Sequence, residues 1–546
     1  MFKESGISVN TADIFPIIKK WLYSDKDIFL RELVSNASDA IAKLKRLVSL
    51  GEASVSPEET YQIKVILDKK KKTIQVIDNG IGMTAEEVKK YINQVAFSGA
   101  KEFLEKYKDN NEANQIIGHF GLGFYSAFMV SDKVEIDTLS YIEGAEPVKW
   151  ISDGGTGYEM TASDKDSRGT VVTLHISDES KEFLDKYELR KILEKYCAFL
   201  PVEIYLEDAE DKKKSKAKKE EGEESEADED LPRPINDTHP LWLKKPSDCK
   251  EDEYKEFYRK VFMDFNEPLF WIHLNVDYPF NLKGILYFPK QRNEMENLEG
   301  QIKLYNNQVF VADNIKEVIP EFLLLLKGVI DCPDLPLNVS RSFLQNDGYV
   351  RKISEHISKK VADKLNSLFK TERENYNKYW DDINPFIKFG CMRDDKFYDR
   401  VKDILIFKST EGDYTLLKDY LNRNSSKHKD QVFYVSDEKQ QAQYIRMFKE
   451  NGLEALYLDT IIDGPFINFL EMKESGIRFS SVDSDISEAL KEKTETEKDD
   501  KELQESLESL FRDLLDVKDL KIQAEALKTP DVPAVILLSE QSRRMQ

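Results

Sequence analysis

A run of charged residues divides the chain into parts that must fold separately. Between Glu207 and Asp230, 18 of 24 residues are charged, and the only apolar side chains are three alanines. Such a segment cannot bury enough apolar surface to offset the entropy lost on ordering. We therefore predict a disordered linker over residues 207–231, between an N-terminal domain (1–206) and a middle domain that begins at 232. A linker of this length reaches about 80 Å when extended, so the flanking domains can move widely. A specific docking role for the segment stays open.

The charge balance limits the possible partners. The 546 residues include 102 acidic and 80 basic side chains, for a net charge of −22. A surface this negative repels phosphate backbones, so we expect no nucleic-acid partner. The longest apolar run, Phe322–Leu326, is too short to cross a bilayer, and the first residues lack the apolar core of a signal peptide. We therefore expect a soluble, cytoplasmic protein of several domains without a membrane partner.

The four cysteines also indicate a cytoplasmic protein. None has a histidine at metal-ligand spacing and no two are close in sequence, which favours buried thiols in a reducing cytosol over disulfides or a zinc site. They are Cys197, Cys249, Cys332 and Cys391.

Hydrophobic periodicity predicts an α+β fold before the linker. Helices with mostly antiparallel strands indicate a two-layer sandwich. The predicted helices are 12–23, 27–48 and 85–95, and the predicted strands are 62–67, 73–77, 133–138 and 170–176.

Helices and strands alternate after the linker, which predicts an α/β middle domain over 232–490. A second charged stretch at 491–502 precedes an apolar helical segment at 503–515, so we place the start of a third domain at 491. Within the middle domain the predicted helices are 251–265 and 350–379, and the predicted strands are 284–288, 308–311 and 431–435.

Two polar residues lie one helical turn apart in R-E-L-V-S-N-A-S-D-A at 31–40. Residues four apart share a helix face, so Glu32 and Asn36 point the same way. A carboxylate can accept a proton from water, and an amide oxygen can hold a hard cation. For the pair alone, a plain polar helix face stays the alternative.

The segment V-I-D-N-G-I-G-M at 76–83 ends a predicted strand in an acid and two glycines. Glycine permits a tight turn and close approach of a ligand, and Asp78 can accept a hydrogen bond from an exocyclic amine such as that of adenine. An ordinary Asn-Gly turn is the alternative. A dinucleotide fingerprint is formally present at 80–85, but no strand–helix–strand unit of the right size follows, and no Walker A motif occurs.

Three glycines precede an apolar helical segment in G-H-F-G-L-G-F-Y-S-A-F at 118–128. Backbone N–H groups at a helix start can bind phosphate, and a glycine hinge is the alternative. The tripeptide R-G-T at 168–170 opens a predicted strand and carries little information alone.

The order E-x-x-x-N, D-x-G-x-G, G-x-x-G-x-G and G-T resembles the GHKL ATPase superfamily, which includes gyrase, histidine kinases, mismatch-repair proteins and the 90-kDa heat-shock chaperones. The strings at 27–40, 118–126 and 334–345 resemble those chaperones in their bacterial form, and the resemblance covers essentially the whole chain. It implies a GHKL (Bergerat) fold for the N-terminal sandwich. It also implies an ATPase that uses ATP and Mg²⁺ to close a clamp on partly folded client proteins.

The resemblance implies a role for individual residues. Glu32 corresponds to the general base, Asn36 to the Mg²⁺ ligand, and Asp78 to the residue that recognises the adenine amine. The other implied nucleotide-binding residues are Gly82, Met83, Gly118, Gly121, Gly123, Phe124, Thr170 and Asn338.

The middle domain is implied to complete the site. Arg341 corresponds to a cation that reaches the γ-phosphate, with Gln345 and Asn338 beside it. A lid over roughly residues 93–125 is implied as well, and in it Phe97 stands where many members have a lysine.

Two other functions compete with the chaperone. A DNA-linked ATPase of the same superfamily would need a basic groove, and a non-catalytic holdase would need only a vestigial nucleotide site. The net charge disfavours the first, and the presence of Glu32, Asn36 and Asp78 disfavours the second.

The resemblance also concerns assembly. The chain stops soon after a predicted strand, Val535–Leu538, where the C-terminal domain of the family continues. We expect 491–546 to be an incomplete C-terminal dimerisation domain. Because a domain that lacks part of its core loses supporting burial, we expect this chain to be monomeric or weakly associated, where the full-length family member is a homodimer.

Overall fold

The computed structural model describes residues 25–93, 103, 122–155, 157–210, 233–290, 301–314, 318–335, 348–484, 499–515, 522, 535–537 and 540. The chain forms two compact units. The first comprises Met1–Pro289, Asn297–Pro320 and Leu326–Ser354, and the second comprises Lys290–Glu296, Glu321–Leu325 and Glu355–Gln546. Among the described residues, no helix is long and apolar enough to cross a membrane.

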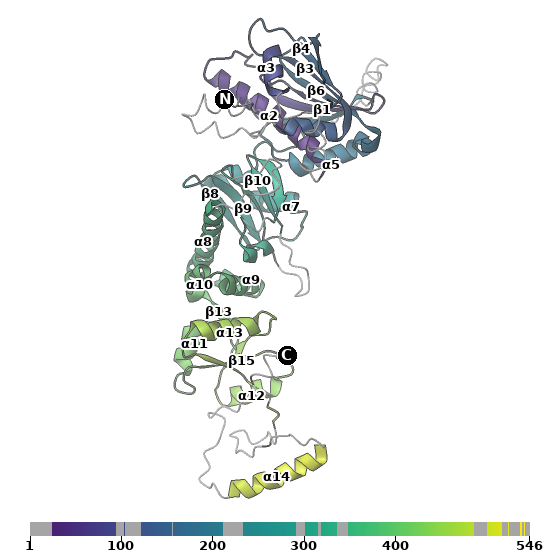
Figure 1. Ribbon diagram of the computed structural model, residues 1–546. Coiled ribbons are helices and arrows are strands. Elements are labelled where there is room, and N and C mark those ends of the chain that lie inside the picture. The colour runs from purple at the N-terminus through teal and green to yellow at the C-terminus, as the bar shows by residue number, and fades with distance from the viewer. Residues whose placement is uncertain are drawn as a thin grey trace, which may run out of the picture. The chain divides into compact units, whose positions relative to one another are not determined.

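A seven-stranded sheet forms the N-terminal part of the first unit (Figure 1). Its order is β5-β4-β3-β6-β2-β1-β7, and all neighbours are antiparallel except β1 and β7. In β1, Ile63, Val65 and Leu67 are buried and alternate with half-buried residues, because only one face of the strand meets the core. The strands are β1 (Gln62–Asp68), β2 (Thr73–Asp78), β3 (Ser131–Leu139), β4 (Val148–Ser152), β5 (Glu159–Ala162), β6 (Gly169–Ile176) and β7 (Glu203–Asp208).

Helix α2 (Ile28–Ser49) packs on this sheet. Leu30, Val34, Ala37 and Ile41 recur at helical spacing and are buried in the same core as the strand residues. The predicted two-layer α+β sandwich is therefore confirmed, while the helix predicted at 12–23 lies outside the described residues. The other helices of this part are α3 (Ala85–Tyr91), η3 (Gly123–Met129), η4 (Asp178–Leu184) and α5 (Lys186–Tyr196).

Hydrogen bonds join residues that flank the charged segment on its two sides. β7 runs two residues into it, to the buried Asp208, which pairs with Leu67 of β1. Beyond it, the Asn236 amide donates to the carbonyls of Leu200 and Val202 at 2.7 and 2.8 Å and accepts from Ile204 N at 2.8 Å. Residues 235–237 therefore lie beside the end of the N-terminal sheet, although the charge pattern placed the start of the middle domain at 232.

A second, five-stranded sheet completes the first unit, in the order β11-β10-β12-β9-β8. Trp242 is fully buried between Phe199 and Tyr305, with ring centroids 4.6 and 5.3 Å away, so aromatic side chains connect the two sheets. The elements are η5 (Leu241–Leu243), η6 (Pro246–Asp248), α7 (Glu251–Phe262), β8 (Phe270–Val276), β9 (Leu282–Phe288), β10 (Gln301–Asn306), β11 (Val309–Asp313) and β12 (Lys327–Asp331).

The single helix predicted over 350–379 is wrong. Two helices, α8 (Gly348–Thr371) and α9 (Arg373–Arg393), meet at Glu372, which leaves helical geometry at φ −138° and ψ 51°. The guanidinium of Arg373 lies 4.1 Å from the ring centroid of Phe369 across the break. No glycine or proline marks this break, so hydrophobic periodicity runs through it.

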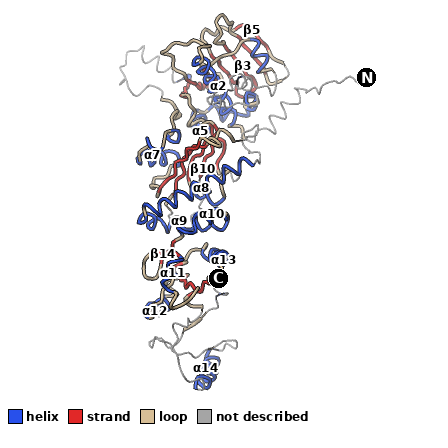
Figure 2. Tube along the Cα trace, turned by 90° about the vertical axis from the view of Figure 1, so that its left-hand side faces the viewer, coloured by secondary structure: helices blue, strands red, loops and turns tan. Residues whose placement is uncertain are grey.

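A small α/β region follows in the second unit, where Figure 2 shows α11, α12 and α13 in blue with short strands in red between them. Its three-stranded sheet has β15 at the centre, parallel to both of its neighbours. Residues 535–537 are not in a strand, contrary to the prediction for Val535–Leu538. The remaining elements of the second unit are η7 (Glu321–Leu325), α10 (Asp395–Val401), η8 (Lys402–Ile404), β13 (Ile406–Lys408), β14 (Tyr414–Leu416), α11 (Leu417–Asn424), β15 (Gln431–Val435), α12 (Ala442–Glu450), β16 (Leu456–Tyr457), α13 (Asp463–Lys473), β17 (Arg478–Ser481) and α14 (Asp499–Leu515).

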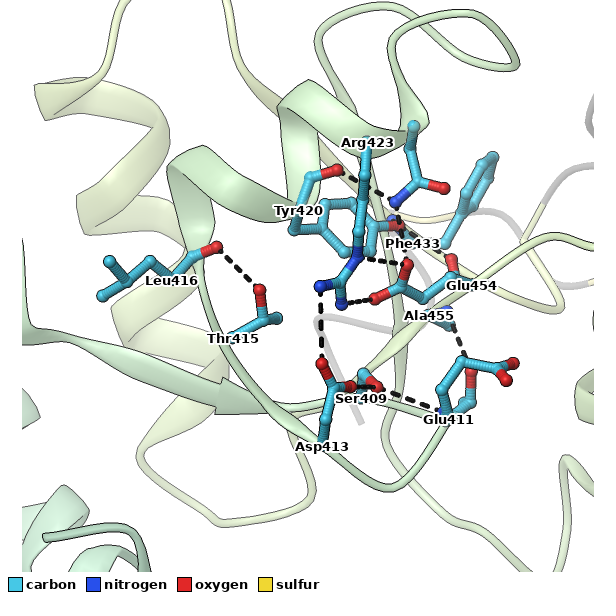
Figure 3. A network of polar contacts seen from close by, with 12 residues as sticks. Ser409, Glu411, Asp413, Thr415, Leu416, Tyr420, Arg423, Phe433, Glu454 and Ala455 are labelled. Carbon is cyan, nitrogen blue, oxygen red and sulfur yellow. Dashed lines mark hydrogen bonds and ion pairs between the residues drawn. The ribbon is translucent and has the colours of Figure 1, made fainter. Parts of the chain in front are cut away.

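A network of polar contacts holds α11 to the strands of this region (Figure 3). The Arg423 guanidinium lies against the Glu454 carboxylate, which also accepts from the Asn424 amide at 3.0 Å. The Tyr420 hydroxyl donates to the Glu454 carbonyl at 2.8 Å and accepts from Phe433 N at 3.2 Å. Glu454 is buried, so its charge is neutralised inside the fold.

All four cysteines are free thiols, and Cys197, Cys332 and Cys391 are buried as predicted, while Cys249 is half-buried. Phe322 of the apolar run is also buried, in contact with Phe386 and Phe397, so its ring belongs to the core.

Candidate nucleotide-binding site

Helix α2 presents a buried acid and an exposed amide on one face. Glu32 is 3% exposed, whereas Asn36, one turn later, is exposed. The Glu32 carboxylate is held by its neighbour: Arg31 Nε and one terminal nitrogen donate to Glu32 Oε1 at 3.1 and 2.8 Å. Arg31 is itself buried, 5.5 Å from the ring centroid of Tyr196. Glu32 therefore has a fixed orientation and a cation beside it.

Gly123, the first residue of η3, lies against the same carboxylate. A Cβ at this position would lie 2.4 Å from Glu32 Oε2, closer than any real contact. Only glycine therefore lets this backbone approach the acid. The end of the glycine-rich segment thus meets the carboxylate on α2, although about ninety residues separate them in the sequence.

Asp78 ends β2 at the point where the chain turns away from the sheet. Its carboxylate oxygen Oδ1 accepts from Gly80 N at 2.8 Å, and the side chain is buried. Burial raises the pKa of Asp78 to about 7, opposed by the Gly80 N–H and by the charges of Lys165 and Arg168. An ionised Asp78 is thus costly unless a donor pairs with it.

The glycines after Asp78 pack against backbone on two sides. A Cβ on Gly80 would lie 2.6 Å from the carbonyl carbon of Ala40 on α2. Gly82 has φ +63°, and a Cβ there would lie 1.9 Å from the carbonyl oxygen of Leu139 on β3. The turn from Asp78 to Met83 therefore needs glycine at both positions to fit between helix and sheet.

A chain of hydroxyl groups joins the turn to β3 and β6. Met83 N donates to Thr138 Oγ1 at 2.9 Å, and that oxygen lies 3.0 Å from Thr170 Oγ1. Thr170 is paired with Asp78 across the β2–β6 ladder. The predicted residues Asp78, Gly82, Met83 and Thr170 thus form one cluster.

Comparisons with known proteins agree with this geometry. Residues 25–150 match the family described as histidine kinase-, DNA gyrase B- and HSP90-like ATPase, and residues 182–542 match the Hsp90 protein family. The chain belongs to the Hsp90 family. Because the Hsp90 match covers most of the chain after the ATPase region, it decides against a DNA-linked ATPase of the same superfamily.

Curated relatives of the Hsp90 family span the whole chain. Chaperone protein HtpG of Bacteroides fragilis is 46% identical over 100% of this chain and 79% of its own length. Those of Porphyromonas gingivalis and Fusobacterium nucleatum are 44% and 34% identical, over 100% and 94% of this chain and 80% and 83% of their own lengths. This Hsp90 chain is an ATP-dependent molecular chaperone and an ATPase.

The structure brings several of the predicted Hsp90 site residues to two places. At the first place, Gly123 lies against Glu32 of α2. At the second, Gly82 and Met83 lie in the turn that begins at Asp78, and Thr170 lies beside that turn. The ring of Phe124 packs against Trp150 at 5.8 Å between centroids, which leaves its backbone as the part that can face a phosphate. The remaining predicted residues, and the lid residue Phe97, lie outside the described residues: Gly118, Gly121, Asn338, Arg341 and Gln345.

The sequence analysis did not identify Arg31 or Thr138 as residues of the site. It also did not show that Arg168 contacts the turn after Asp78. Arg31 adjoins Glu32, but neighbours on a helix do not face each other, so only burial shows that it folds back onto the acid. Thr138 reaches the site through the β3–β6 register, in which it faces Thr170. Arg168 belongs to the R-G-T tripeptide, which is too short to be informative alone.

Proposed function

We propose that ATP binds between α2 and the Asp78–Met83 turn and is hydrolysed there. The observation that carries this proposal is the buried Asp78 carboxylate, which the fold holds at a glycine turn with a pKa near 7. A donor that enters the site and pairs with Asp78 offsets the cost of its charge. The exocyclic amine of adenine is such a donor, and Thr170 and Met83 lie beside it in the cluster.

Glu32 is proposed to take the proton from the attacking water. General-base catalysis needs a carboxylate fixed within hydrogen-bond reach of that water, and Arg31 and Gly123 fix Glu32 from two sides.

The residues present fit Mg²⁺ as a partner of the nucleotide. Asn36 offers a neutral amide oxygen at the exposed end of the pair, and oxygen ligands at the phosphates and in water complete the coordination that Mg²⁺ prefers. Bound there, Mg²⁺ supplies charge neutralisation on the phosphates. We propose Asn36 as its protein ligand.

The backbone of the glycine-rich segment is proposed to bind the phosphates, with Gly118, Gly121, Gly123 and Phe124 as its contributors. Arg341 of the middle domain is proposed to stabilise charge on the γ-phosphate, assisted by Gln345 and Asn338. These roles rest on sequence resemblance, and the position of Gly123 beside Glu32 supports the first of them.

At the level of the whole protein, we propose that this ATPase closes a clamp on partly folded client proteins in the cytoplasm, with homodimers as the working form of the family. The domain boundaries predicted at 207, 232 and 491 are part of this proposal.

Two substitutions test the division of labour at the site. Asp78→Asn should abolish ATP binding, because its hydrogen bond is made in the ground state, whereas Glu32→Ala should leave binding intact and stop hydrolysis. Isothermal titration and a steady-state ATPase assay on the full chain separate the two effects. The reverse assignment of binding and turnover would contradict the proposal, and an inactive wild-type chain that still binds clients would favour the holdase.

A further inference from the structure

Arg168 binds the turn after Asp78 through the backbone carbonyl groups of that turn. The β2–β6 ladder ends at Asp78, paired with Thr170, so the next two carbonyls, of Asn79 and Gly80, need other partners. Arg168 supplies them. Its Nε donates to Gly80 O at 3.0 Å, and a terminal nitrogen donates to Asn79 O at 3.0 Å.

Glu59 holds Arg168 in turn. The same terminal nitrogen of Arg168 forms an ion pair with Glu59, and the two side chains are only 17% and 23% exposed. The Asn79 amide donates to Glu59 Oε1 at 3.3 Å and to Thr60 O at 2.8 Å, and its oxygen accepts from Gln62 N at 3.1 Å. The segment before β1 and the segment before β6 are thus joined at the turn.

The neighbouring residue adds a steric restraint. Gly169 has φ +112°, and a Cβ there would lie 2.1 Å from the carbonyl oxygen of Asp78. The backbone of Asp78 is therefore confined by Gly169 while Arg168 holds the next two carbonyls. A guanidinium suits this task because its donors have a fixed planar arrangement that an ammonium lacks.

These contacts lie outside the core. Glu59, Asn79 and Arg168 line a cavity of about 400 Å³, and Gln62, Lys64, Asp78 and Lys165 also line it. Gln62 and Lys64 alternate along β1 with the buried Ile63 and Val65, which face the core shared with α2. Because successive side chains of a strand point to opposite faces, the cavity is on the face of the sheet that α2 does not cover.

We propose that Arg168, anchored by Glu59, is a positioning residue that fixes the Asp78–Gly80 turn for recognition of the adenine amine. This inference rests on the proposed role of Asp78. Arg168 touches neither base nor phosphate in this scheme. It acts by holding two carbonyls, and thereby sets where the Asp78 carboxylate meets its donor.

The test compares ATP with inosine triphosphate, which has a carbonyl oxygen in place of the exocyclic amine. Titration calorimetry on the full chain gives the dissociation constants of both nucleotides, and their ratio reports the hydrogen bond at Asp78. Wild type should prefer ATP by on the order of tenfold or more, as a bond to a charged acceptor implies. Arg168→Gln should weaken ATP binding by on the order of tenfold, leave inosine triphosphate nearly unaffected, and bring the ratio close to one.

Three further variants separate positioning from charge and from folding. Lys165→Gln removes a cation near Asp78 that donates no side-chain bond to the turn, and it should keep the ratio. Arg190→Gln removes a cation from the exposed Arg190–Glu194 pair on α5 and should keep both affinities. Arg168→Lys keeps the charge but not the planar pair of donors, so it should lose part of the preference even if the glutamine variant fails to fold.

Each outcome has one meaning. If wild type fails to discriminate between the nucleotides, the proposed role of Asp78 is wrong. If wild type discriminates and both Arg168 variants keep its ratio, or weaken the two nucleotides equally, the positioning role is wrong. If Lys165→Gln lowers the ratio as much as Arg168→Gln, charge rather than positioning governs Asp78 and the inference is overturned.

Discussion

Asp78 is a buried carboxyl group whose charge decides what it can bind. Its pKa is raised to about 7 by burial, so near neutral pH it exists in both forms. The ionised form accepts the stronger hydrogen bond from an amine, because a charged acceptor strengthens the bond and a protonated carboxyl group uses one of its oxygens as a donor. The residue therefore makes nucleotide recognition sensitive to pH in the physiological range.

The affinity for ATP should consequently fall as the pH drops below about 7, by up to about tenfold per pH unit. Inosine triphosphate corrects for titration of the phosphates, so the ratio of the two affinities from pH 6 to 8 is the quantity to measure. A ratio that stays constant across this range would show that Asp78 does not change its charge there.

The same pKa predicts a cost to stability. Because the pKa of Asp78 is raised in the folded state, protonation favours folding, and this contribution is lost as the pH rises through about 7. Without nucleotide, Asp78→Asn should therefore raise the melting temperature at pH 8 relative to wild type and change it little at pH 4. Scanning calorimetry at the two pH values checks the sign, and a variant that is less stable at pH 8 would contradict it.

Gly123 allows a prediction about the catalytic acid. Gly123→Ala forces Glu32 Oε2 to move, since the new Cβ would lie 2.4 Å away. A shift of about 1 Å in a catalytic group costs on the order of 100-fold in rate, so kcat should fall by that order. Gly157→Ala, where a Cβ meets nothing within 4 Å, is the matched control and should keep the wild-type rate. An unchanged kcat in Gly123→Ala would argue against Glu32 as the base.

At the scale of elements, regular patterns were predictable and their interruptions were not. Helix α2 and the strand β2 followed from periodicity, because apolar residues recur at helical spacing in α2 and alternate along most of β2. The break at Glu372 could not be predicted, because no glycine or proline marks it and the apolar periodicity continues through it. Only a folded chain reveals which of several possible side-chain contacts form.

The residues proposed to act on the nucleotide could be predicted from the sequence, whereas the residues that position them could not. Glu32, Asn36 and Asp78 stand in short motifs whose spacing carries the signal. The residues that hold them are different: Arg31 contacts its own neighbour against the usual helical geometry, and Thr138 depends on strand register. Neither relation leaves a pattern in one sequence, since burial and pairing over long separations decide them.

The network around Glu454 gives a prediction at this scale (Figure 3). Glu454→Ala removes the acceptor of Arg423 and Asn424 in a buried setting, which should cost about 2–3 kcal/mol of local stability. Glu450→Ala, which removes the exposed pair with Arg446 on α12, should cost only about 0.3–0.5 kcal/mol. Hydrogen exchange of the β15 amides measures the two effects, and equal protection in both variants would show that the network adds no stability.

At the scale of the whole molecule, the chain returns to the N-terminal sheet after its charged segment. The Asn236 amide bonds to residues 200–204, so the residues that flank the segment are close together regardless of its length. Charge composition could not show this, because it reports that a segment resists folding, not where its ends are attached. Communication between the ATPase site and the rest of the chain therefore need not depend on the extension of the linker.

The proposed role of Arg341 tests that communication. If Arg341 stabilises charge on the γ-phosphate only as hydrolysis proceeds, Arg341→Ala should lower kcat by on the order of 100-fold and leave the ATP dissociation constant within about twofold of wild type. Arg351→Ala, an exposed arginine on α8, removes the same charge nearby in sequence and should change neither quantity. Single-turnover hydrolysis, together with calorimetric titration of ATP, measures both. An equal loss in the two variants would mean that overall charge governs the rate, and full activity in Arg341→Ala would mean that Arg341 takes no part in hydrolysis.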